Sequence, residues 1–113
     1  MARLRSDFWV SAHLRRLDVE GIPAVQRRRG SPEAGAIFVK VDRLDGTADL
    51  YGPAPQALFD QETSGERRFA PLMERADSPD VEARIAKEIR FDGDLWIVEI
   101  DDREGRHRLD LAE

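Results

Sequence analysis

Residues 36–41 read AIFVKV, and this stretch decides the fold. Its first four residues are apolar on both alternating sides, whereas a strand with one face in water alternates apolar and polar residues. The stretch therefore predicts an interior strand over residues 35–42, with other structure packed above and below it. Residues 95–100 read LWIVEI and predict a second buried strand over 95–101 by the same argument.

Weaker strand signals lie on either side of these two segments. Asp45-Gly46 is the clearest turn signal in the chain, because this pair adopts the backbone conformation that a tight hairpin turn requires. The alternating residues 46–52 then predict a return strand. We also expect a strand over residues 22–29, and another over 106–111 that forms a hairpin with the strand before it.

Two helices are predicted, one near each end of the chain. After Ser6, which is a suitable N-cap, apolar residues recur at helical spacing until Gly21, a residue typical of helix ends. Ser78 is the predicted N-cap of the second helix, with Pro79 at the first helical position, and this helix is expected to end near Phe91.

These signals predict one α+β domain spanning residues 1–113, with a mainly antiparallel β-sheet packed by two α-helices. A chain of 113 residues falls in the usual size range of a single domain. The conformation of residues 56–75 is left open. The expected core consists of large apolar side chains from both ends of the chain: Trp9, Leu14, Leu17, Ile37, Val39, Leu50, Ile85, Ile89, Trp96 and Val98.

Composition limits the classes of function. The chain contains no cysteine, which excludes disulfides, thiolate nucleophiles and cysteine-ligated metals. Neither a signal peptide nor a long apolar run is present, so a cytoplasmic location without membrane contact is expected. The net charge is −5, yet residues 1–30 carry seven arginines and only three acids, so the positive charge is concentrated near the N-terminus.

Acidic residues provide no convincing catalytic or metal site. Residues 45–47 read DGT and resemble part of a phosphatase signature, but Arg43 stands where that signature has its first aspartate. A hairpin turn explains these residues better. The carboxylates in 92–94 and 101–102 have the chemistry to bind a divalent cation, but roles in turns and caps explain them better.

The two histidines also assemble no catalytic group. His13 lies among apolar residues of the first predicted helix and is expected to be packed with a satisfied ring, whereas His107 is expected to be solvated. No serine has a recognisable base beside it. We therefore predict no catalytic residue, no metal ligand and no cofactor.

Arginine dominates the basic residues: 16 of the 18 are arginine. This excess indicates either bidentate recognition of anions or a bias of the coding sequence. The strongest cluster is the run 27–29. In an extended chain its side chains alternate in direction, so one must face the core, where pairing with an acid such as Glu33 or Asp49 is an alternative to anion recognition.

The sequence contains six distinctive short strings: SDFWV at 6–10, RRG at 28–30, AGAIFVK at 34–40, LYGPAPQ at 50–56, RFD at 90–92 and WIVE at 96–99. Together they resemble a family of small bacterial proteins catalogued as domain of unknown function 1491. The resemblance extends over nearly the whole chain and implies one compact domain. It implies no activity, cofactor or catalytic residue.

From these observations we expect a non-catalytic binding or adaptor module whose arginine-rich N-terminal surface contacts an acidic protein partner. One alternative is a small enzyme or ligand-binding domain with a pocket near Tyr51. Another is weak binding to nucleic acid, which the acidic remainder of the chain opposes. Oligomeric state stays open. The candidate binding residues are Arg15, Arg16, Arg27, Arg28, Arg29, Tyr51 and Gln56.

Overall fold

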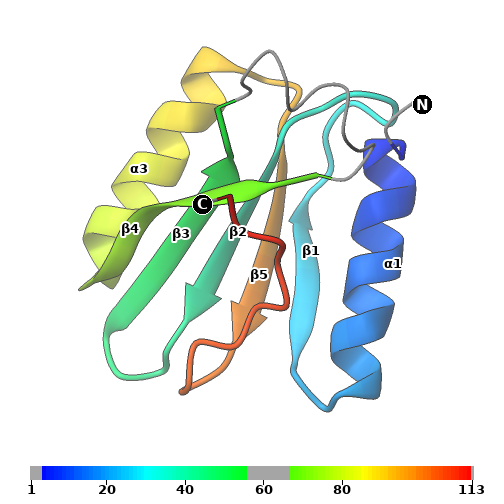
Figure 1. Ribbon diagram of the computed structural model, residues 1–113. Coiled ribbons are helices and arrows are strands. Elements are labelled where there is room, and N and C mark those ends of the chain that lie inside the picture. The colour runs from blue at the N-terminus through cyan, green and yellow to red at the C-terminus, as the bar shows by residue number, and fades with distance from the viewer. Residues whose placement is uncertain (1–3, 56–66, 113) are drawn as a thin grey trace.

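The computed structural model describes residues 4–55 and 67–112. Its elements in chain order are α1 (Ser6–Val19), β1 (Ala24–Arg28), β2 (Ile37–Asp42), β3 (Thr47–Pro53), β4 (Phe69–Asp77), α3 (Ser78–Phe91) and β5 (Trp96–Asp101). The α+β class is confirmed, as are the two helices (Figure 1). Among the described residues, no helix combines the length and apolar character needed to cross a membrane.

The five strands form one sheet in the order β1-β5-β2-β3-β4 (Figure 1). Neighbouring strands are antiparallel except β2 and β5, which pair in parallel with Val39 opposite Val98. The two strands with the most continuous apolar sequence therefore lie side by side in the interior of the sheet. This placement confirms the prediction that both are buried on two faces.

One helix covers each face of the sheet (Figure 1). Ile37 and Val39 of β2 belong to the same core cluster as Leu17 of α1. Phe38, which lies between them in the strand, belongs to the cluster that contains Val81 of α3. Because successive side chains of a strand point to opposite faces, one apolar strand supplies the core beneath both helices.

The predicted core is largely confirmed. Trp9, Leu14 and Ile89 are only partly buried, and the other predicted core residues are buried. Trp96 is fully buried, and its indole N–H donates a hydrogen bond to the carbonyl of Ser31 at 2.8 Å.

The helix starts differ from their prediction by one residue. Ser6 lies inside α1, after an N-cap at Arg5, and its hydroxyl donates to the carbonyl of Gly35 at 2.7 Å. Ser78 is likewise the first residue of α3, after an N-cap at Asp77. Neither N-cap makes a side-chain capping bond, so packing against the sheet does more to set these helix starts than capping does.

Residues 106–111 do not form the predicted strand. β5 already pairs with β1 on one edge and β2 on the other, so it has no free edge for a hairpin partner. The carboxylate of Asp102 instead accepts a hydrogen bond from the backbone N–H of Arg106 at 2.7 Å, which turns the chain away from the sheet. Within the described residues, a single bridge between Phe69 and Leu111 joins this segment to a strand.

The strand that sequence reasoning left open is β4, which pairs antiparallel with β3. Its register shifts twice, near Leu50 of β3, so its burial shows no regular alternation. Irregular burial removes the period-two pattern by which a strand is recognised in sequence. Residues 56–66, which belong to the same open segment, lie outside the described residues.

Candidate functional site

Arg27 belongs to an ion-pair network on the α3 side of the sheet. Its guanidinium lies 2.9 Å from Glu82 of α3 and 3.1 Å from Glu99 of β5. Lys40 is almost fully buried and places its ammonium 2.6 Å from the same Glu82 carboxylate. The hydrogen bond from Arg27, followed by that from Lys40, lowers the pKa of Glu82 to about 2. Arg27 therefore serves to attach α3 to the sheet.

The other two arginines of the run also contact the domain itself. Arg28 donates to the backbone carbonyls of Gly93 at 3.0 Å and Leu95 at 2.7 Å. The guanidinium of Arg29 lies 5.1 Å from the centre of the Trp96 ring, within the range of a cation–π interaction. All three arginines thus stabilise contacts between β1 and its neighbours.

The acidic partners predicted for this run were wrong. Asp49 is fully buried, and its carboxylate lies 2.8 Å from Arg43 and accepts a hydrogen bond from the backbone N–H of Arg75. Glu33 lies 3.8 Å from Arg5. Asp49 points to the α1 side of the sheet, whereas Arg27 reaches the α3 side, and strand alternation alone could not reveal this difference.

Tyr51 is buried rather than lining an open site. It is 6% exposed, and its ring centre lies 4.6 Å from that of His107. Burial raises the pKa of the Tyr51 phenol and lowers the pKa of His107. The prediction that His107 is solvated was wrong, because the segment after β5 folds back over the sheet. Gln56, which was grouped with Tyr51, lies outside the described residues.

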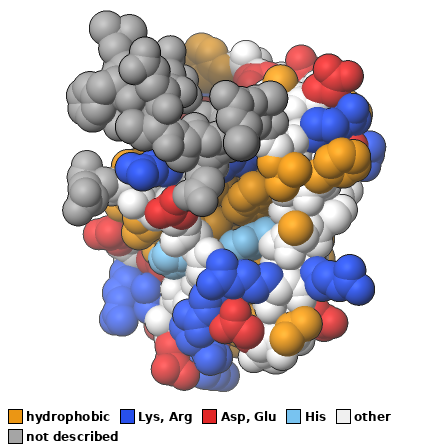
Figure 2. Space-filling model, turned by 45° about the vertical axis from the view of Figure 1, so that its right-hand side comes forward, with side chains coloured by type: hydrophobic (Ala, Val, Ile, Leu, Met, Phe, Trp, Pro, Cys, Tyr) orange, Lys and Arg blue, Asp and Glu red, His pale blue; other side chains and the backbone are white. Residues whose placement is uncertain are grey.

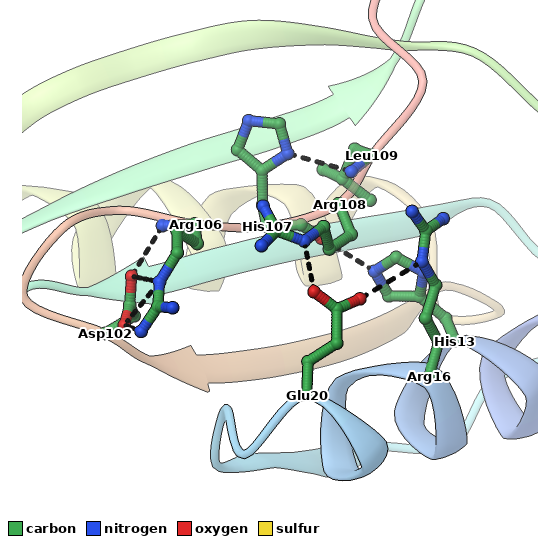
Figure 3. A network of polar contacts seen from close by, with 8 residues as sticks. All are labelled: His13, Arg16, Glu20, Asp102, Arg106, His107, Arg108 and Leu109. Carbon is green, nitrogen blue, oxygen red and sulfur yellow. Dashed lines mark hydrogen bonds and ion pairs between the residues drawn. The ribbon is translucent and has the colours of Figure 1, made fainter.

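His13 is packed with a satisfied ring, as predicted. Its ring stacks on Trp9 with centres 4.6 Å apart, and its Nε2 lies 2.8 Å from the carbonyl oxygen of His107 (Figure 3). A carbonyl can only accept a hydrogen bond, so Nε2 carries the proton. Burial lowers the pKa of His13 and favours the neutral ring. This contact joins α1 to the C-terminal segment.

The outer side of α1 carries an apolar groove bordered by arginines, which we call the α1 groove. Its volume is about 570 Å³. Phe8 is 56% exposed and Val19 is 81% exposed, so large apolar side chains of this helix face solvent. The residues that line the α1 groove are Phe8, Ser11, Ala12, Arg15, Arg16, Val19 and Glu20.

A second cavity, which we call the basic cleft, opens between α1 and the C-terminal segment. It has a volume of about 360 Å³. Figure 2 shows this side of the molecule, where parts of histidine side chains are visible between basic and apolar ones. The residues that line the basic cleft are Leu4, Trp9, His13, Arg16, Arg67, Arg108 and Asp110.

Ion pairs and hydrogen bonds hold the arginines of the basic cleft in place. Glu20 lies between two of them, 2.7 Å from Nε of Arg108 and 3.5 Å from Nε of Arg16 (Figure 3). The terminal nitrogen of Arg67 donates to the hydroxyl of Ser6 at 2.8 Å and to the carbonyl of Leu4 at 3.1 Å. The side chains are thus oriented before any ligand arrives.

Sequence reasoning selected Arg15 and Arg16 but missed Arg67 and Arg108. These last two residues lie far from α1 in the sequence and outside any motif. No local signal distinguishes them from the other arginines, because Arg67, just before β4, and Arg108, in the segment after β5, come near Arg16 only through the tertiary fold.

The acidic residues considered as metal ligands have other roles. The carboxylate of Asp92 accepts a hydrogen bond from the backbone N–H of Asp94 at 2.9 Å, which is a turn contact. A different group, Asp42, Glu99 and Asp101, places carboxylate oxygens within 4.8 Å of one another. Glu99 of this group already receives the positive charge of Arg27.

Nearly the whole sequence matches one described family. The model of the family described as "Protein of unknown function (DUF1491)" matches residues 4–110. The chain belongs to the DUF1491 family. The resemblance inferred from six short strings is therefore confirmed, whereas no curated protein matches the sequence.

Solved structures of DUF1491 proteins and a similar protein share the fold over nearly their full length. The crystal structure of a DUF1491 family protein from Caulobacter crescentus CB15 is 35% identical, with a TM-score of 0.77, and the match covers 97% of this chain and 98% of the other. The solution structure of protein Atu0922 from A. tumefaciens is 41% identical, with a TM-score of 0.84, and the match covers 98% and 96%. A second Caulobacter structure, determined by NMR, is 36% identical with a TM-score of 0.78 and full coverage of both chains.

Proposed function

We propose that this DUF1491 protein is a non-catalytic binding module whose α1 groove recognises an acidic, partly apolar segment of another protein. The observation that carries the proposal is the exposure of Phe8 and Val19 beside Arg15 and Arg16 on one helix face. Exposed apolar surface has a free-energy cost in water, which contact with a partner would remove.

Charge complementarity specifies the partner. Among residues 4–55 and 67–112, Arg15 has no acidic side chain within ion-pair distance, and Arg16 shares Glu20 with Arg108. Carboxylates of a partner would therefore meet two guanidiniums at the edge of an apolar groove. Arginine beside apolar and aromatic residues is also the composition that recurs in protein interfaces.

A protein partner is favoured over the other two expectations. The arginines of the run 27–29 are engaged within the domain, and the net charge of −5 opposes binding to a polyanion such as nucleic acid. The enzyme or ligand-binding alternative relied on a pocket near Tyr51, but that side chain is buried beneath His107. The α1 groove is open to solvent.

Site-specific photocrosslinking inside the native cell tests this proposal. A photoreactive amino acid replaces Ala12 in the α1 groove, and a matched control replaces Ala86, an exposed alanine on the outer face of α3. We expect one acidic protein to crosslink through position 12 and not through position 86. Equal crosslinking from both positions would refute the proposal.

Binding of the captured protein, purified, is then measured by calorimetry against a charge-reversed double variant, Arg15→Glu with Arg16→Glu. The expected loss is at least tenfold in affinity, because two attractive contacts become repulsive. The control is Lys87→Glu with Arg90→Glu on α3, which should bind within twofold of the parent. An affinity that does not change in the α1 variant would show that the captured protein binds elsewhere.

A further inference from the structure

Three arginines from distant parts of the chain line the basic cleft. Arg16 comes from α1, Arg67 from the residues just before β4, and Arg108 from the segment after β5. We propose that the basic cleft binds a small molecule that carries a phosphate monoester on an apolar body. This site shares Arg16 with the α1 groove but requires neither Arg15 nor a protein partner.

The charge of the basic cleft suits an anionic ligand. Among the described residues that line it, three guanidiniums face one carboxylate, that of Asp110, and Glu20 bridges two of the guanidiniums from the side. Arg16 and Arg108 share the single carboxylate of Glu20, so this pair keeps about one positive charge for an anionic group such as a phosphate monoester. Guanidinium is the side-chain group whose donor geometry best fits phosphate oxygens.

Glu20 orients the guanidiniums without using all of their donors. Both contacts to Glu20 are made through the Nε nitrogens of Arg16 and Arg108 (Figure 3). Each guanidinium has four further N–H donors on its terminal nitrogens. Two partly fixed forks therefore present their terminal donors near one cavity, which reduces the ordering cost of ligand binding.

The wall of the basic cleft explains why the ligand should also have an apolar body. Trp9 and Leu4 line the cavity, and the stacking of Trp9 on His13 holds the indole in place. A hydrogen bond between His13 and the His107 carbonyl in turn fixes the imidazole. The volume of about 360 Å³ falls at the lower end of the range for small-molecule pockets, about 300–1,000 Å³, which favours a compact ligand.

NMR titration of the ¹⁵N-labelled protein with phenyl phosphate, inorganic phosphate and benzyl alcohol tests the proposal. Phenyl phosphate should shift the indole N–H of Trp9 and leave that of Trp96, which is buried and bonded to Ser31, unchanged. We expect inorganic phosphate to bind at least fivefold more weakly than phenyl phosphate, and benzyl alcohol to cause no shift. Equal binding of phenyl phosphate and benzyl alcohol would refute anion recognition.

The variant that tests the site is Arg108→Gln, with Arg106→Gln as its matched control. Both arginines lie in the same segment and pair with an acid, but Arg106 pairs with Asp102 and does not line the basic cleft. Arg108→Gln should weaken phenyl phosphate binding at least tenfold, and Arg106→Gln should change it less than twofold. Equal losses in the two variants would indicate a general charge effect and overturn the site.

Three further measurements keep the test decisive. If the spectrum of Arg108→Gln shows loss of folding, Arg108→Lys replaces it; lysine preserves the charge beside Glu20 but lacks the planar fork, so at least threefold weaker binding is expected. A phosphotyrosine hexapeptide should bind more weakly than phenyl phosphate, and tighter binding would assign the site to a modified protein instead. Arg15→Glu should leave phenyl phosphate affinity unchanged, which separates this result from that of the α1 groove.

Discussion

The two helices have the same length, 14 residues, and cover opposite faces of one sheet, yet their outer sides differ. The exposed positions of α3 carry mainly small or charged side chains, namely Ala83, Ala86, Lys87 and Arg90. Its one large exposed apolar residue in the described structure is Phe91, the last residue of the helix. By contrast, α1 exposes Phe8 and Val19 along the α1 groove.

This comparison separates what folding requires from what it does not explain. Burial of the inner side explains nearly all of the residue pattern of α3, because the outer side of this helix is ordinary solvated surface. The outer side of α1 contributes nothing to the core and still carries apolar groups and arginines. This difference is the reason for our proposal that α1, rather than α3, contacts a partner outside the domain.

The largest expected effect concerns the inner sides of the two helices, which we expect to contribute similarly to the free energy of unfolding. Leu17 of α1 and Ile85 of α3 are both buried, so Leu17→Ala and Ile85→Ala should each lower the free energy of unfolding by about 2–5 kcal/mol. Val19→Ala, on the exposed side of α1, should cost less than about 0.5 kcal/mol. Urea unfolding measures all three, and a cost below about 1 kcal/mol for either core variant would contradict the equivalence.

The next effect concerns the ion pairs that Glu82 of α3 makes with the sheet. The pKa of Glu82 is lowered to about 2, so its contribution is present above the ordinary glutamate pKa and is lost as pH falls from about 4.5 toward 2. Because the side chain is 39% exposed, we reduce the expected contribution for solvent screening to about 1–2 kcal/mol.

Glu82→Gln should therefore destabilise the protein by about 1–2 kcal/mol at pH 7, with the difference from the parent disappearing near pH 2. Asp80→Asn provides the control, an exposed acid in the first turn of α3 outside this network. Denaturant unfolding at several pH values measures the effect. A constant difference between Glu82→Gln and the parent across that range would show that packing, not charge, is responsible.

A third test compares the exposed aromatic residues of the two helices. Phe8→Ser should weaken binding of the purified α1 partner about tenfold, about 1.4 kcal/mol, whereas Phe91→Ser should change it less than twofold. Both variants should retain stability within about 1 kcal/mol of the parent, because neither side chain is in the core. Calorimetric titration and thermal melting provide the two measurements; similar binding losses in both variants would remove the distinction between the helices.

The smallest expected effect is a pH dependence confined to the α1 side. Burial lowers the pKa of His13, so the unfolded chain binds a proton more readily than the folded protein. The contribution of neutral His13 to stability is therefore fully present above the unfolded histidine pKa of about 6.5. It decreases as pH falls through the lower pKa of the folded protein. The groups around the ring act in both directions: the hydrogen bond to the His107 carbonyl and the charge of Glu20 raise the pKa of His13, whereas Arg16 and the His107 ring lower it.

Thermal melting of the parent and His13→Gln between pH 7.5 and 5.5 checks this effect. The parent should lose more stability than the variant over that interval, by less than the loss attributed to Glu82 at lower pH. His107, whose pKa is also lowered by burial, accounts for a remaining slope in the variant. Identical slopes would show that His13 titrates as it does in the unfolded chain.

Most of the secondary structure could be predicted from local pattern. Residues 36–41 and 95–100 are apolar on both faces, and the structure buries them in adjacent central strands. Helical spacing placed both helices within a residue of their observed starts. β4 was missed because its register shifts remove the alternation, and 106–111 was assigned wrongly because its apparent partner, β5, has both edges occupied.

The sites were less predictable than the fold. Three consecutive arginines looked like a ligand-binding feature, yet Arg27 and Arg28 bond to groups 55 to 72 residues away in the sequence and stabilise the domain. Arg108 gave no local signal and is brought to α1 through Glu20, 88 residues distant. Side-chain type says which contacts an arginine can make, but not which partner will be near it.

By itself, the sequence determined the two helices, four of the five strands, that apolar residues from both ends of the chain share a core, and which family the protein belongs to. Only the tertiary structure decided that β5 lies between β1 and β2, and that Arg16, Arg67 and Arg108 line one cavity. The physical reason is the sequence separation between the residues that interact. Periodicity reflects interactions over a few residues, whereas strand order and the basic cleft depend on packing between distant segments, as in the 94-residue separation between His13 and His107.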